Sequence, residues 1–163
     1  MDDMIALNPN QVVRFLNKKP EEFTKKDIMS FVEKNDIRVV NFRYVGGDGK
    51  LKLLNFIIND RKYLEKILSC GERVDGSSLF PYIATHSSDL YVVPRYKTAF
   101  VNPFSQVPSL DLMCSFFDKH GKPLDIAPEN ILKKAHTALK EKTGMALEAL
   151  GELEFYVSSP LDK

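Results

Sequence analysis

The amino-acid sequence predicts an α+β protein in which a small β-grasp-like sheet packs on a helix. Two runs rich in β-branched and aromatic residues, 37–45 and 50–58, flank the turn sequence GGDG, which is a strong hairpin signal. Helical patterns precede and follow this hairpin, so the predicted order is helix, helix, hairpin, helix, strands, helix, strand. This segregation of helices from strands is typical of α+β folds. The 163 residues, 44% of them hydrophobic, suffice for one domain, or for one small domain and part of another.

Two helices are predicted before the hairpin. The segment 8–18, NPNQVVRFLNK, begins with Asn and Pro signals and places Val12, Val13 and Leu16 at helical spacing. In the segment 24–35, Thr24 has the character of an N-cap, and three apolar residues that follow it form one stripe. Both helices therefore have one apolar face to bury.

A third short helix is predicted directly after the hairpin. The segment DRKYLEKIL, residues 60–68, starts at Asp60, which can cap the first turn, and is closed by Gly71. The stretch from 71 to 108 is then irregular, broken by Gly, Ser, Pro and Asn, with short strands such as LYVV inside it. Long irregular stretches are uncommon in compact domains, and this one is too apolar for disorder, so it is a candidate functional region.

The sequence DGSS within this stretch, residues 75–78, has two interpretations. It is a turn, in which Asp75 bonds to its own backbone and Gly76 is free to take positive φ. Alternatively, Asp75 is a carboxylate presented beside two hydroxyl groups, including that of Ser78, to grip a small cation or amine. Composition alone leaves both open.

The remaining chain is predicted as strand, turn, helix and strand. The strand is SLDLMCSFF, residues 109–117, and the helix is residues 127–144, with Pro128 in its first turn and Gly144 at its end. In the final predicted strand, 145–157, Glu152 and Glu154 point to the same side, roughly 7 Å apart. They are either the acidic outer face of a half-exposed strand or a pair of oxygen ligands for Mg²⁺ or Mn²⁺.

Charge and composition exclude several classes of partner. The 23 basic and 22 acidic residues nearly cancel, so no basic excess points to nucleic acid. No segment has the apolar length that a membrane span needs, so we expect no membrane association. Cys70 and Cys114 lack metal-type spacing and make no disulfide framework, which favours a reduced, cytoplasmic setting.

Five motifs in sequence order resemble the N-terminal part of glutamine synthetase. That family has a DGSS stretch, a Ser-Asp followed by Pro, an Asn/Asp-Pro-Phe, a helix start containing Pro, and a G-x-E-x-E-F strand. The matching segments of this chain are VDGSSL (74–79), SSDLYVVP (87–94), VNPF (101–104), APENILKKA (127–135) and GELEFYV (151–157). The resemblance covers most of the chain from about residue 37 onward.

The resemblance implies a division into three parts. Residues 1–34 are an N-terminal helical extension, residues 35–122 the β-grasp domain, and residues 123–163 the start of the catalytic domain, its first helix and strand. The family joins ammonia to glutamate with ATP as co-substrate, so it implies a glutamate–ammonia ligase for the parent protein. The family's remaining metal ligands and ATP pocket lie beyond the E-x-E strand, so we expect the 163 residues alone to be inactive and to bind Mg²⁺ or Mn²⁺ only weakly.

Site roles are carried over from the matching motifs. Glu152 and Glu154 resemble the family's two metal-binding glutamates, which serve Mg²⁺ or Mn²⁺. Asp75 resembles the aspartate of the ammonium site, with Ser78 close by in the same loop. The family builds each site between neighbouring subunits, so Asp75 is expected to act across an interface in a ring-shaped homo-oligomer whose substrates are glutamate, ammonium and ATP.

Two departures from the family pattern keep alternatives open. The Gly-Trp that often follows DGSS is replaced by LFPYIATH, and the Asp-Pro-Arg before the helix is Ala127–Pro128–Glu129. The alternatives are a ligase that joins glutamate to another amine such as a polyamine, a non-catalytic synthetase-like assembly module, and an unrelated β-grasp binding module. Retention of two repelling glutamates at 152 and 154 argues against a purely structural role.

Overall fold

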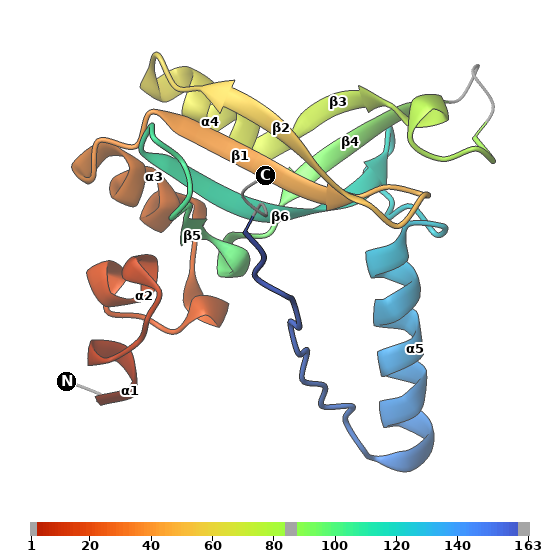
Figure 1. Ribbon diagram of the computed structural model, residues 1–163. Helices are drawn as coiled ribbons and strands as arrows, with labels where there is room; N and C mark the ends of the chain where they lie inside the picture. Colours follow the sequence, from red (N-terminus) through yellow and green to blue (C-terminus); the bar gives the residue numbers. More distant parts are fainter. Residues whose placement is uncertain (1–2, 84–87, 160–163) are drawn as a thin grey trace. The chain divides into compact units, whose positions relative to one another are not determined.

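The computed structural model describes residues 3–83 and 88–159 (Figure 1). The α-helices are α1 (Asp3–Ala6), α2 (Gln11–Leu16), α3 (Lys25–Lys34), α4 (Arg61–Cys70) and α5 (Pro128–Thr143). The strands are β1 (Val39–Val45), β2 (Leu51–Ile57), β3 (Glu72–Asp75), β4 (Asp89–Pro94), β5 (Phe100–Val101) and β6 (Ser109–Asp118). Short 3₁₀ turns are η1 (Pro20–Glu22), η2 (Gly76–Ser78) and η4 (Tyr96–Thr98). The α+β prediction is confirmed.

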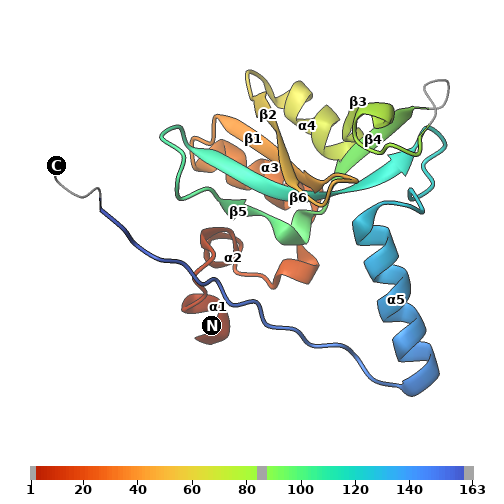
Figure 2. The same ribbon diagram turned by 45° about the vertical axis from the view of Figure 1, so that its right-hand side comes forward.

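The strands form one mixed sheet in the order β2-β1-β6-β4-β3, with β5 pairing to β6. β1 and β2 are the predicted antiparallel hairpin, whereas β1 and β6 run parallel, with Val39 opposite Ser109. The ten-residue β6 is the central strand, because its first half pairs with β1 and its second half with β4. Figures 1 and 2 show α3 and α4 on the same face of this sheet.

The predicted caps explain where the helices begin. The Thr24 side chain accepts a hydrogen bond from the backbone N–H of Asp27. The Asp27 carboxylate in turn accepts one from the backbone N–H of Thr24, and the two bonds form a capping box. Asp60 caps α4 by accepting from the N–H of Tyr63 at 2.8 Å. Gly71 ends the same helix at φ +69°, and a Cβ there would lie 2.2 Å from the carbonyl oxygen of Val92, so only glycine fits.

The core lies between the sheet and these helices. Alternate residues of the two parallel strands face it, since Val40, Phe42, Leu110 and Leu112 are each 0% exposed. Phe116 closes the cluster, with its ring edge-on to both Tyr44 and Phe80. The described helices include none long and apolar enough to cross a membrane.

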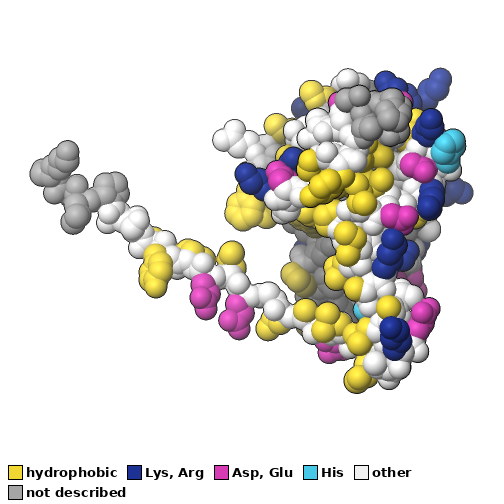
Figure 3. Space-filling view, turned by 90° about the vertical axis from the view of Figure 1, so that its right-hand side faces the viewer, with side chains coloured by type: hydrophobic (Ala, Val, Ile, Leu, Met, Phe, Trp, Pro, Cys, Tyr) yellow, Lys and Arg dark blue, Asp and Glu magenta, His cyan; other side chains and the backbone are white. Residues whose placement is uncertain are grey.

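The chain divides into two compact units, Met1–Ile131 and Leu132–Lys163. The first holds the sheet, the core and the first turn of α5. The second holds the rest of α5 and an extended segment that carries exposed apolar and acidic side chains (Figure 3).

The strand predicted at 145–157 does not form. Residues 145–159 have no regular secondary structure, and in the described part of the chain no strand pairs with them. Leu153 and Phe155 are 88% and 73% exposed, so the alternating pattern buries nothing. The physical reason is that a strand is stable only when its backbone N–H and C=O groups bond to a neighbouring strand and one of its faces is covered.

Candidate functional site

The DGSS sequence forms a tight loop where β3 meets η2. Asp75 is the last residue of β3, and Gly76, Ser77 and Ser78 make the 3₁₀ turn. Gly76 is buried, and its N–H donates to the carbonyl oxygen of Ser88 at 2.6 Å. A Cβ at Gly76 would lie 2.6 Å from Leu90 Cδ1 and 2.9 Å from the Ser88 oxygen, so glycine is required for this close packing.

The carboxylate of Asp75 is held by the turn that follows it. Its Oδ1 accepts from the Ser77 hydroxyl at 2.8 Å and from the Ser77 backbone N–H at 3.0 Å. These two bonds, together with one from the Ser88 side chain, hold the pKa of Asp75 below its ordinary value. Asp75 is exposed, so it presents an ionised and oriented carboxylate to solvent at neutral pH.

Among the described residues, Asp75 has no cationic side chain as a partner. Asp89 lies opposite Asp75 in the register of β3 and β4, and Arg73 pairs with Asp89 at 3.4 Å. Within residues 3–83 and 88–159, no Lys or Arg nitrogen lies within 4.0 Å of the Asp75 carboxylate. The loop therefore has the charge and the access to bind a small cation or a protonated amine.

The hydroxyl of Ser78 bonds to the backbone of the loop and not to the Asp75 carboxylate. Its hydroxyl donates to the backbone oxygen of Asp75 at 2.7 Å, and the residue is exposed. Sequence reasoning selected Ser78 and passed over Ser77, although Ser77 makes the bonds to the carboxylate. The tendency of Asp to bond to the backbone two residues on would have identified Ser77.

We expect Ser77→Ala to raise the pKa of Asp75 toward its ordinary value of 3.8, because the hydrogen bond from the Ser77 hydroxyl, which lowers this pKa most, is lost. A carboxyl whose pKa is lower in the folded than in the unfolded chain stabilises the fold at a pH above its pKa in the unfolded chain. That contribution disappears as the pH falls through its pKa in the folded chain. In Ser77→Ala the Asp75 carboxyl therefore contributes less to stability at neutral pH. NMR titration of the carboxyl carbon measures the change. Ser78→Ala is the matched control, since the Ser78 hydroxyl donates to the backbone oxygen of Asp75 and not to its carboxylate. An equal rise of the Asp75 pKa in both variants would contradict the assignment.

Glu152 and Glu154 lie in the second unit, apart from any secondary structure. Both are exposed, and neither makes a hydrogen bond or an ion pair with a described residue. Among the residues that the structure describes, no three His, Cys, Asp or Glu side chains gather where they could hold a metal ion. The two glutamates thus supply free carboxylate oxygens, and further ligands would have to complete a site.

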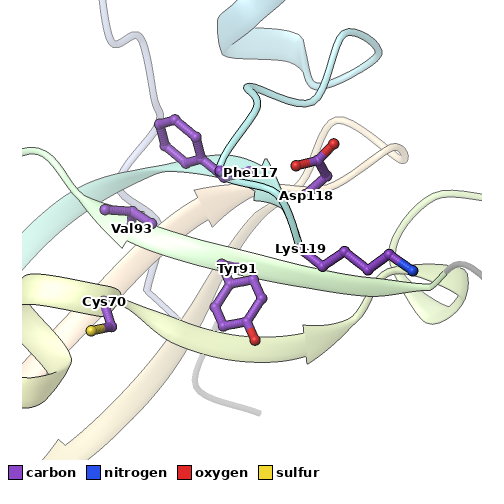
Figure 4. Close-up of a pocket in the computed structure, with 7 residues that line it drawn as sticks. Cys70, Tyr91, Val93, Phe117, Asp118 and Lys119 are labelled. Carbon is purple, nitrogen blue, oxygen red and sulfur yellow. The ribbon is translucent and has the colours of Figure 1, made fainter.

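Two pockets of the first unit are lined by other described residues. One of about 280 Å³ lies where Tyr91 and Val93 of β4, Phe117 of β6 and Cys70 at the end of α4 come together (Figure 4). Another of about 590 Å³ is lined by Arg43, Asn102 and Phe104 with their neighbours. Neither contains Asp75 or Ser78.

The cysteines offer no reactive thiol pair. Cys70 is exposed and Cys114 is buried, and both are free. Burial raises the pKa of the Cys114 thiol far above its ordinary value, which removes it as a nucleophile at neutral pH.

Comparison with known proteins places this fold and this loop in a family. Residues 36–119 match the family model described as glutamine synthetase, beta-Grasp domain. The chain is 31% identical over 135 residues to 3-hydroxylaminophenol mutase of Cupriavidus pinatubonensis, covering 82% of this chain and 27% of that protein. It is 30% identical over 137 residues to glutamine synthetase of Azorhizobium caulinodans, covering 82% of this chain and 29% of that protein.

The fold is also similar to a solved structure. Glutamine synthetase of Plasmodium falciparum superimposes with a TM-score of 0.63 at 20% identity, over 74% of this chain and 23% of that one. The chain spans between 27% and 30% of the length of the curated relatives it matches. The family match covers more than half of the chain, including the hairpin, the DGSS loop and β6, and this chain therefore belongs to the glutamine synthetase β-grasp domain family.

Proposed function

We propose that this chain is the N-terminal part of a glutamine synthetase-type ligase, which joins ammonia to glutamate at the expense of ATP. Its parts are the helical extension 1–34, the β-grasp domain 35–122 and the start of the catalytic domain, 123–163. Family membership over residues 36–119 and the small share of each relative that the chain spans support this division. The catalytic machinery for ATP then belongs to the rest of the ligase.

The observation that carries the proposal is the exposed, ionised carboxylate of Asp75, which has no Lys or Arg partner among the described residues. An ammonium ion bound there gains a charge-assisted hydrogen bond. The carboxylate accepts one proton of the ion, and the nitrogen lone pair then forms the C–N bond to the activated side-chain carbonyl carbon of glutamate. The C–O bond to phosphate breaks, phosphate leaves with that electron pair, and the second proton that the nitrogen loses on becoming an amide goes to the leaving phosphate.

Glu152 and Glu154 are the proposed protein ligands for Mg²⁺ or Mn²⁺. Their chemistry fits, because carboxylate oxygens are the ligands these ions prefer and neither side chain bonds to a described residue. When bound, such ions neutralise charge on the transferring phosphoryl group. Two carboxylates do not fill the coordination of two ions, so further ligands must complete the site. In this proposal Asp75 acts across a subunit interface in a ring-shaped homo-oligomer.

A second candidate is a ligase that joins glutamate to a larger amine. The sequence after DGSS favours it, since Leu79, Phe80 and Pro81 stand where the family often has Gly-Trp. Phe80 is buried, so the segment that follows DGSS is held against the core. In this proposal the shape of the loop around Asp75 decides whether ammonium or a larger amine binds.

The test is an activity assay of the full-length ligase with ATP, glutamate and Mg²⁺ or Mn²⁺. We expect phosphate release and glutamine formation that depend on ammonium. Phosphate release with putrescine or methylamine and none with ammonium would support the second candidate. No ATP consumption with any amine would refute both and leave a non-catalytic assembly module.

A further inference from the structure

The turn between β1 and β2 lies directly against the segment that follows the DGSS loop. The backbone N–H of Gly47 donates to the carbonyl oxygen of Leu79 at 2.9 Å. A Cβ at Gly47 would lie 3.0 Å from that oxygen and 3.2 Å from both Phe80 Cδ1 and Pro81 Cδ. The hairpin turn and the loop therefore touch backbone to backbone, and a side chain at this position would push residues 79–81 away by a few tenths of an ångström.

The contact continues from Leu79 into the turn that holds Asp75. The N–H groups of Leu79 and Phe80 donate to the carbonyl oxygen of Gly76, at 3.1 Å and 2.8 Å. Gly76 is in turn bonded to Ser88 of the segment that leads into β4. A displacement at Leu79 is thus transmitted through two hydrogen bonds to the residue next to Asp75.

Phe80 anchors the far end of this connection. Its side chain is 2% exposed, and its ring lies edge-on to that of Phe116 at 5.0 Å between centroids. Because Phe80 is fixed in the core, Leu79 cannot move away from Gly47 without disturbing buried aromatic packing.

We infer that Gly47 is a positioning residue for the Asp75 carboxylate, acting through its hydrogen bond to Leu79. The hairpin turn sets the position of residues 79–81, these close the 3₁₀ turn on Gly76, and the turn aims Ser77 at the carboxylate. The inference rests on the proposed role of Asp75. It assigns a function to the GGDG turn beyond joining two strands.

The test compares Gly47→Ala with Gly49→Ala in this 163-residue chain. Gly49 has φ +73° and no atom within 4 Å of an added Cβ, so its substitution strains the same turn without touching the loop. We expect Gly47→Ala to shift the amide resonances of Ser77 and to raise the NMR titration midpoint of Asp75 toward that of an ordinary aspartate. We expect Gly49→Ala to leave both as in the unsubstituted chain, while lowering stability.

A measurement on the unsubstituted chain does not depend on either variant folding. The scalar coupling across the hydrogen bond between the Gly47 nitrogen and the Leu79 carbonyl carbon is expected to be detectable. Its absence, or equal effects of Gly47→Ala and Gly49→Ala on Asp75, would overturn the inference. Neither outcome bears on ammonium-dependent activity, so a failure here is distinguishable from a failure of the proposed function.

Discussion

Asp75→Asn is expected to lower the ammonium-dependent kcat/KM of the full-length ligase by about 10²- to 10⁴-fold, the range that a positioned acid–base group contributes. The amide oxygen of Asn still accepts from Ser77, so the loop keeps the hydrogen bonds that Oδ1 of Asp75 makes at 2.8 and 3.0 Å. What disappears is the negative charge and the proton acceptor. Steady-state kinetics at varied ammonium concentration measures the change.

The matched control for this experiment is Asp36→Asn. Asp36 is exposed, pairs with Arg38 at 3.2 Å, and lies before β1, at the opposite end of that strand from the hairpin turn. It has φ +49°, a conformation that Asn tolerates well, so the substitution removes one surface charge and little else. Activity of Asp75→Asn within a few-fold of the Asp36→Asn variant would remove Asp75 from the ammonium site.

Asp111→Ala is expected to lower the free energy of unfolding by about 3–5 kcal/mol, because it leaves buried polar groups without their partner. Asp111 is 0% exposed. Its carboxylate accepts from the Arg43 guanidinium, from Asn41 at 2.6 Å and from Asn102 at 3.2 Å. This loss is large against the roughly 5–15 kcal/mol that stabilises a typical domain. Equilibrium urea denaturation followed by circular dichroism gives the value.

A double variant separates the cost of unpaired charge from the cost of lost volume. In Asp111→Leu combined with Arg43→Met, both charges are removed and apolar atoms fill the space, so the loss is expected to be smaller than in Asp111→Ala. If the double variant is as unstable as the single one, the buried ion pair is not the source of the effect. Asn102 belongs to the VNPF motif, so this network also gives that motif a structural role.

Local signals in the sequence predicted most of the helices and the hairpin. The N-cap at Thr24, the cap at Asp60 and the proline at 128 act within one turn, and the structure begins α3, α4 and α5 at those positions. The GGDG turn likewise joins β1 and β2 as expected. The pairing of β1 with β6 involves residues 70 apart, such as Asn41 and Asp111, and no local pattern specifies it. The two-residue β5 and the helix α1 were too short to predict.

The sequence by itself determined the family, the α+β class and the DGSS loop, since each depends on residue order and on bonds within a few residues. The orientation of Asp75 by Ser77 is of the same local kind. Only the tertiary structure decided that Asp111 is buried in a polar network, that the hairpin turn contacts Leu79, and that residues 151–157 lack a strand partner among the described residues. These three results depend on which distant segments meet, and alternation of apolar residues predicts a face to be covered without specifying what covers it.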